Sequence, residues 1–134
     1  MTSSNESVQD AINRACANLE VTVKEMGVSL AFDPSNISEL EEVLLAIRDM
    51  EDECALTGAC FMIGAYIGEI LRRMIGGQWA MSADGIASLQ LPDGRDKIFP
   101  VEKARKFVQN PHGESLAFYA QALLTRNRIT GRSA

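Results

Sequence analysis

The segment that decides the fold runs from Cys54 to Trp79 and reads CALTGACFMIGAYIGEILRRMIGGQW. It follows a cluster of acidic residues, stays apolar for about four helical turns, becomes basic at Arg72 and Arg73, and stops at Gly76-Gly77. Acids before a helix and arginines at its end both suit the helix dipole. The pattern predicts a buried central helix over about residues 52–75, with the rest of the chain packed around it.

Two glycines inside this segment, Gly64 and Gly68, lie one turn apart on the same helical face. Each glycine costs roughly 1 kcal/mol of helix propensity relative to alanine. We therefore expect another element to approach the helix backbone closely at this face. That element is either another part of the core or a bound ligand.

The size of the chain, 134 residues, predicts a single domain over 1–134 with frayed ends at about 1–4 and 130–134. The longest uncharged apolar stretch, Cys54–Gly68, is shorter than the roughly 20 residues that a membrane span needs. The first residues, MTSSNESVQD, lack the basic start and apolar run of a signal peptide. We expect a cytoplasmic protein that does not enter the membrane.

The cysteines and the one histidine do not form a metal-binding or catalytic pattern. Cys16, Cys54 and Cys60 are an odd number without C-x-x-C spacing, and His112 lies in a loop of its own. The chain also lacks the phosphate-binding, zinc-protease and nucleophile-elbow motifs. We expect no metal, no cofactor and no enzymatic activity.

Hydrophobic periodicity places further helices on both sides of the central one. Apolar residues at helical spacing predict helices over about 5–26, 36–49, 101–109 and 114–127. Alternating residues and turn signals predict short strands near 79–81, 86–91 and 97–99, and residues 28–32 are either a strand or an extended connector. The predicted fold class is therefore α+β: about five helices around the central one, with a small antiparallel meander over about 79–99.

Charge is distributed unevenly along the chain. Residues 1–69 contain 13 acidic and three basic residues, whereas residues 70–134 contain five acidic and ten basic ones. The acidic half disfavours nucleic-acid binding and suits a partner with a basic surface. The expected partner-binding surface, here called the acidic strip, consists of Glu39, Glu41, Glu42, Asp49, Glu51, Asp52 and Glu53.

A second candidate site lies along the central helix. Glu69 is three and four residues before Arg72 and Arg73, so all three share one helix surface, with Tyr66 one turn earlier. Together with Trp79, these residues form either a ligand pocket in which an arginine holds a carboxylate or phosphate, or a structural ion pair.

Basic residues between Arg95 and Lys106, together with Arg126, Arg128 and Arg132 near the tail, raise a third possibility, single-stranded nucleic-acid binding. Such sites usually interleave cations with aromatic rings. Only Phe99 and Phe107 accompany these cations in the sequence. We expect nucleic acid not to be the partner.

The run Gly64-Ala65-Tyr66-Ile67-Gly68-Glu69, followed by Arg72-Arg73 and by Gly76-Gly77-Gln78-Trp79, resembles a group of uncharacterised small bacterial proteins. Their shared pattern is G-A-Y-[IL]-G-E-x-x-R-R…G-G-x-W, and the similarity covers about residues 27–125. The resemblance implies an α+β fold and a bacterial source, but no activity. Small proteins of this kind can act as immunity proteins beside secreted toxins.

The sequence thus leads to two functional hypotheses. The first is a non-catalytic protein-binding domain, such as an immunity protein that neutralises a bacterial toxin through the acidic strip. The second is a ligand-binding or enzymatic domain that uses Tyr66, Glu69, Arg72 and Trp79.

Overall fold

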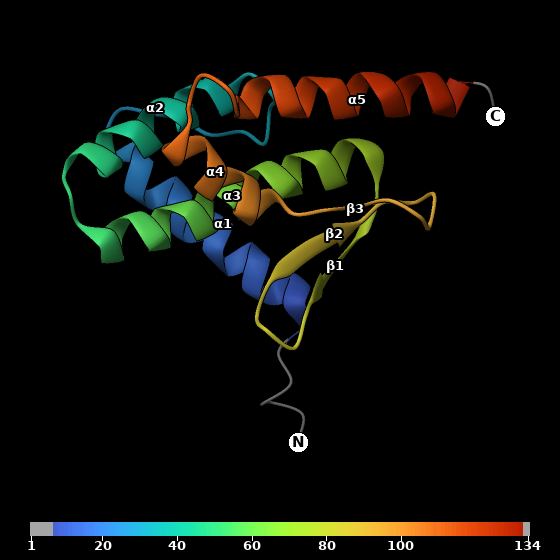
Figure 1. Cartoon of the computed structure of the whole chain (residues 1–134), viewed down its shortest axis with the longest axis horizontal. Coiled ribbons are helices and arrows are strands. Elements are labelled where there is room, and N and C mark those ends of the chain that lie inside the picture. Colours follow the sequence, from blue (N-terminus) through green and yellow to red (C-terminus); the bar gives the residue numbers. More distant parts are fainter. Residues whose placement is uncertain (1–6, 133–134) are drawn as a thin grey trace.

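The computed structural model describes the backbone of residues 7–132 and the side chains of residues 7–127. Its elements confirm the predicted α+β class (Figure 1). In chain order they are α1 (Val8–Lys24), α2 (Asn36–Asp49), α3 (Glu53–Ile75), β1 (Gln78–Met81), β2 (Ala87–Gln90), β3 (Lys97–Ile98), α4 (Pro100–Gln109) and α5 (Leu116–Arg132).

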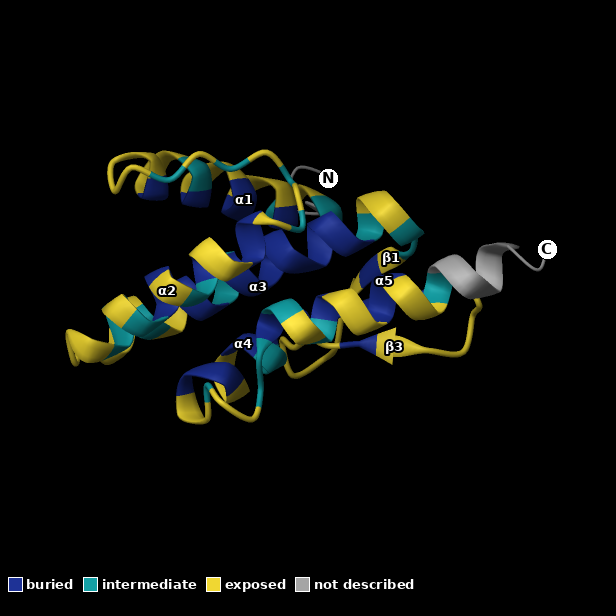
Figure 2. Ribbon diagram, turned by 90° about the horizontal axis from the view of Figure 1, so that it is seen from above, coloured by how far each residue is buried: buried dark blue, intermediate teal, exposed yellow. Residues whose placement is uncertain are grey.

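The long helix α3 forms the centre of the molecule. It contacts α1, α2, α4 and α5, and every residue from Ile63 to Leu71 is buried (Figure 2). Its length and composition would allow it to cross a membrane, but 61% of its most apolar window is buried within the fold. Burial of this kind is typical of the core helix of a domain.

The glycine face of α3 is covered by other parts of the same chain. Gly64 lies against the backbone of Pro100 and Val101 at the start of α4, and the indole ring of Trp79 lies over Gly68. The close approach predicted from the two glycines is therefore confirmed, and the approaching elements are α4 and β1.

The three strands form an antiparallel sheet in the order β1-β2-β3. Trp79 pairs with Leu89, and Leu89 pairs with Ile98, so these three apolar residues are neighbours across the sheet. All three are buried, while α1 contacts β1 and α4 contacts β2. The sheet thus extends the core beyond the end of α3.

The connector between α1 and α2 contains no strand among residues 25–35. Asn36 takes over its hydrogen bonding: the amide oxygen accepts the N–H groups of Ala31 and Asp33, and the amide nitrogen donates to the carbonyl of Ser29. Phe32 has a φ of 54°, which is unfavourable for a bulky side chain. The extended-connector alternative therefore holds for residues 28–32.

The bounds of the two terminal helices differ slightly from the prediction. Helix α1 begins at Val8, because the hydroxyl of Ser7 accepts the N–H of Asp10 and caps it. The predicted frayed segment 1–4 lies outside the described residues. Of the segment 130–134, only the backbone of residues 130–132 is described, and it belongs to α5.

Candidate functional site

Tyr66 is fully buried in α3 and holds the α1–α2 connector in place. Its ring stacks on that of Phe32, with 4.4 Å between the centroids, and its hydroxyl accepts the Phe32 N–H at 2.8 Å. The same hydroxyl donates to Glu20 at 3.5 Å. Burial raises the pKa of Tyr66 to about 12. The side chain therefore stays a neutral phenol that makes structural bonds.

Arg73 completes this stack. Its guanidinium lies 3.5 Å from the centre of the Phe32 ring. This is a cation–π contact, which is worth about 0.5–1 kcal/mol at exposed sites. Contacts from Arg73 and Tyr66 hold Phe32 in its left-handed backbone conformation.

Glu69 is a buried carboxylate with two partners of its own. Its side chain is 1% exposed; Arg72 Nε donates to Oε2 at 2.6 Å and Gln9 Nε2 donates to the same oxygen at 2.8 Å. A buried charge is tolerated when it is paired and hydrogen-bonded. The Arg72 side chain is 33% exposed, so this ion pair of α3 extends from the core to the surface. Gln9 bonds to it from α1.

The carboxylate of Glu69 also affects a neighbouring thiol. Burial, together with the negative charges of Glu69 and Glu20, raises the pKa of Cys16 to about 12, although Arg73 opposes this. A thiol with so high a pKa is a poor nucleophile, because the thiolate is the reactive form. Cys16 is therefore an inert core residue.

Trp79 lies on a different face of α3 from these polar groups. Its six-membered ring covers Gly68 and adjoins Pro100. Its indole Nε1 is buried and has no hydrogen-bond partner. The five residues of the predicted pocket are thus divided. Tyr66, Glu69 and Arg73 contact α1 or the connector, and Arg72 pairs with Glu69 on α3 itself. Trp79 instead packs its side chain from β1 onto Gly68 of α3.

The residues of the acidic strip occupy two different environments. Glu39, Glu42 and Asp49 lie on one face of α2 and are exposed, and Glu51, Asp52 and Glu53 are exposed at the corner between α2 and α3. Three of them have local partners: Glu39 accepts the Asn36 side-chain amide at 2.9 Å, Arg48 Nε lies 3.2 Å from Asp49, and the carboxylate of Asp52 caps α3 by accepting the Ala55 N–H.

Glu41 differs from the rest of the strip because it faces α5. Its Oε2 accepts the N–H groups of Leu116 and Ala117 at 2.6 and 2.9 Å, and the hydroxyl of Ser115 at 3.2 Å. A carboxylate at this position satisfies free donors and the dipole at the start of a helix. Glu41 therefore has a structural role, because it joins α2 to the start of α5.

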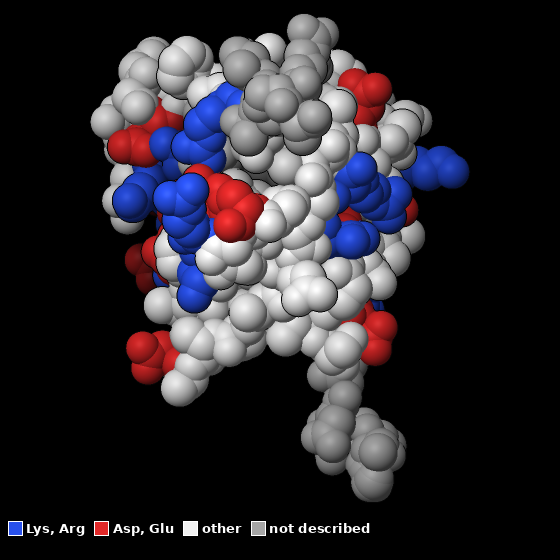
Figure 3. Space-filling model, turned by 90° about the vertical axis from the view of Figure 1, so that its right-hand side faces the viewer, with Lys and Arg blue, Asp and Glu red and all other residues white. Residues whose placement is uncertain are grey.

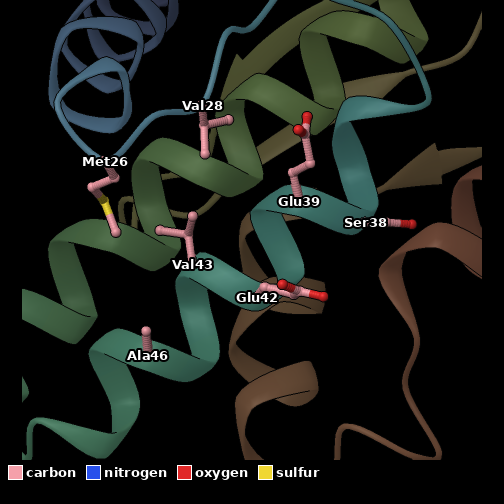
Figure 4. Close-up of a pocket in the computed structure, with 7 residues that line it drawn as sticks. All are labelled: Met26, Val28, Ser38, Glu39, Glu42, Val43 and Ala46. Carbon is pink, nitrogen blue, oxygen red and sulfur yellow. The ribbon is translucent and has the colours of Figure 1, made fainter.

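An apolar hollow adjoins the exposed acids of α2 (Figure 4). Its volume is about 380 Å³, and its lining consists of Met26, Val28, Ser38, Glu39, Glu42, Val43 and Ala46. The side chains of Met26, Val28 and Val43 point toward one another from the connector and from α2. We call this hollow, with Glu39 and Glu42 at its rim, the acidic groove.

Several residues in both regions were not identified from the sequence. Gln9 and Phe32 partner the polar residues of α3, and Met26 and Val28 form a wall of the acidic groove. One available signal was the position of Met26 directly before Gly27, at the end of the apolar α1 pattern. In the structure α1 ends at Lys24, so Met26 belongs to the connector. Among residues 7–127, no cluster of three or more His, Cys, Asp or Glu residues could hold a metal ion.

Comparison with known families places the chain in one of them. The sequence model of DUF6278, a family of unknown function, matches residues 2–123, so the chain belongs to this family. No match was found among curated proteins or among solved structures.

Proposed function

We propose that this member of DUF6278 is a cytoplasmic, non-catalytic domain that binds another protein through the acidic groove. The observation that supports this most is the combination of an apolar hollow with exposed carboxylates at its rim. Met26 is 52% exposed there, although it is a large apolar residue. Such a surface suits a basic segment that inserts an apolar side chain between Met26, Val28 and Val43.

The charges around the groove determine which partners suit it. Glu39 and Glu42 flank the hollow, and Asp49, Glu51 and Glu53 continue the negative surface toward the α2–α3 corner. A partner that presents Lys or Arg beside an apolar anchor gains complementary charge and a faster encounter. The apolar anchor would supply most of the affinity, since exposed ion pairs contribute little.

The second hypothesis, a ligand or enzyme site on α3, has less support. Tyr66 and Glu69 are buried, and their polar atoms already bond to Phe32, Gln9 and Arg72. A ligand would have to displace those bonds and leave buried groups without partners, at a cost of about 1–3 kcal/mol each. We therefore treat these residues as structural: Tyr66 supports the connector, and Glu69 links α3 to α1.

An immunity protein is one role that fits this proposal. A small domain with an acidic binding face would block a toxin whose active surface is basic, by covering that surface. The proposal needs no chemistry from the domain itself, only a stable complex.

The test is affinity capture from the native lysate at low and high salt, with the wild type and two charge-reversal variants. Glu42→Lys changes the rim of the groove, and Asp84→Lys makes the same charge change in the exposed β1–β2 turn. The proposal predicts a stoichiometric partner, identified by mass spectrometry, that Asp84→Lys retains and that Glu42→Lys and high salt release.

Two outcomes would reject the acidic groove. One is a partner held equally by wild type and Glu42→Lys, and the other is no partner at either salt concentration. The immunity role has a separate test: expression of the captured protein should stop growth, and co-expression of wild type, but not Glu42→Lys, should restore it. A partner that is harmless when expressed would exclude this role and leave the binding proposal intact.

A further inference from the structure

A second surface, on β3, α4 and α5, has the opposite charge to the acidic groove. Two adjoining hollows of about 450 and 360 Å³ lie there and share Lys103 and Tyr119 in their walls. Lys97 and Lys106 line the first, and Phe118 lines the second. We call this region the lysine–aromatic surface.

Two aromatic rings are exposed on this surface. Phe118 is 75% exposed and Phe99 is 42% exposed, although both are among the most apolar side chains of the chain. Scattered single apolar residues on a surface are ordinary, whereas rings beside a hollow mark interaction sites. Here each ring adjoins one of two hollows that meet at Tyr119.

The wall between the hollows is held firmly. Lys103 forms an ion pair with Glu114, and its Nζ lies 5.3 Å from the centre of the Tyr119 ring. The side chain of Lys103 is only 18% exposed. This arrangement links α4 to the start of α5, so the hollows exist before any partner arrives.

The positive charge at the rim is moderate. Lys97 and Lys106 are exposed on the first hollow, while Glu102 also lines it. Arg126, on the second hollow, pairs with Asp96 at 3.3 Å. Figure 3 faces the end of the molecule at which α5 ends, and basic side chains there gather in two groups with largely uncharged surface between them.

We propose that the lysine–aromatic surface binds a short acidic, amphipathic segment of a second protein. The partner places an aromatic or aliphatic side chain in each hollow, against Phe99 and Phe118, and carboxylates beside Lys97 and Lys106. This partner differs from the basic one proposed for the acidic groove. The domain would then join two proteins of opposite charge.

The same features disfavour a nucleic-acid strand. A polyanion gains affinity from many cations along its backbone. Here Glu102 and Glu114 interrupt the lysines, and the whole chain has a net charge of −5. A short segment with a few carboxylates and apolar anchors matches the mixture of hollows and lysines better.

The test is selection of random 12-residue peptides on the whole immobilised protein, followed by affinity measurements on the enriched peptides. The expected peptides combine Asp or Glu with Phe, Leu or Trp. The double variant Lys97→Glu/Lys106→Glu should weaken their binding about tenfold or more, because it replaces attraction by repulsion at two positions around the first hollow. Phe118→Ala should weaken it as well.

Two variants serve as matched controls. Lys24→Glu makes the same type of charge reversal on the exposed surface of α1, and Glu42→Lys alters the acidic groove. Both should bind the acidic peptides within about twofold of the wild type. Thermal unfolding of each variant shows that it is folded.

The proposal fails if no acidic peptides are enriched, or if the enriched ones bind the double lysine variant as well as the wild type. It also fails if a 15-residue oligothymidine binds this surface more tightly than the peptides do, which would make the partner a nucleic acid. Basic peptides that depend on Glu42 would bear only on the acidic groove, so the two proposals stand or fall separately.

Discussion

Gly64 in α3 packs directly on the backbone of Val101 in α4, so that a Cβ on Gly64 would lie 2.5 Å from the Val101 Cα. A contact this short involves backbone, which cannot turn aside as a flexible side chain can. Because this is where α3 and α4 cross, the glycine sets the distance between the two helices.

Gly64→Ala should therefore lower the free energy of unfolding by about 1–3 kcal/mol, the usual cost of overpacking a core. Gly58 is the matched control: it lies in the same helix, and nothing stands within 4 Å of its missing Cβ. Gly58→Ala should stabilise the protein by up to about 1 kcal/mol through helix propensity. Urea unfolding measures both, and equal effects of the two substitutions would contradict the packing described here.

Glu41 and Glu42 are neighbours in sequence with different roles. Glu41→Ala removes the acceptor for two N–H groups at the start of α5, and should cost about 0.5–2 kcal/mol of stability. Glu42→Ala removes an exposed carboxylate, and should change stability by less than about 0.5 kcal/mol. Thermal or urea unfolding distinguishes them; a larger loss for Glu42→Ala would reverse the assignment of the two acids.

Tyr66→Phe removes the hydroxyl that accepts the Phe32 N–H, and leaves that N–H unpaired. We expect a loss of about 1–3 kcal/mol, together with faster amide hydrogen exchange in the connector. Because Met26 and Val28 belong to this connector, partner binding at the acidic groove should weaken too.

Tyr119→Phe provides the comparison for that experiment. Tyr119 is a partly buried tyrosine. Burial raises its pKa to about 12, although a hydrogen bond from the backbone of Phe99 acts in the opposite direction. Loss of the Tyr119 hydroxyl should speed amide hydrogen exchange near Phe99 and leave the amides of the α1–α2 connector protected. Faster exchange in the connector of both variants would indicate general loosening instead.

The raised pKa values of Cys16 and Tyr66 predict sensitivity to alkali. The fold keeps both groups protonated to about pH 12, whereas the unfolded chain releases the thiol proton near pH 9 and the phenol proton near pH 10. The contribution of these two groups to the free energy of unfolding is fully present below pH 9. It decreases as the pH rises toward 12, because the unfolded state then binds fewer protons than the folded state.

The free energy of unfolding should thus decrease between pH 8 and pH 10.5, and Cys16→Ala should make that decrease smaller. Cys54→Ala serves as the control, since Cys54 is exposed. Urea unfolding at the two pH values measures the decrease. If Cys16→Ala and Cys54→Ala show the same decrease, burial does not control the thiol at position 16.

The sequence predicted the frame of this fold well because its helices carry strong local signals. The spacing of apolar residues gave α2 at 36–49 and α3 to within one residue of its start. The glycine pattern of α3 also predicted a close approach, which Val101 and Trp79 make. The connector was ambiguous because its conformation depends on distant partners: Phe32 is held by Tyr66, 34 residues away.

The candidate sites depended more on the tertiary structure. Glu39, Glu41 and Glu42 appear alike in sequence, and only the position of α5 separates Glu41 from the other two. The apolar wall of the groove, Met26 and Val28, could not be assigned before the path of the connector was known. The exposure of Phe118 likewise follows from which face of α5 packs on the core.

The stack of Arg73, Phe32 and Tyr66 separates the residue that anchors the connector from the residues that line the acidic groove. The stack holds the connector at the ring of Phe32. The wall of the acidic groove lies several residues before Phe32, at Met26, which is half exposed. Substitutions at Met26 should therefore change the shape of the groove at little cost in stability. If the acidic groove binds a partner as proposed, a change at Met26 would alter the partner that fits it while leaving the Phe32 stack in place.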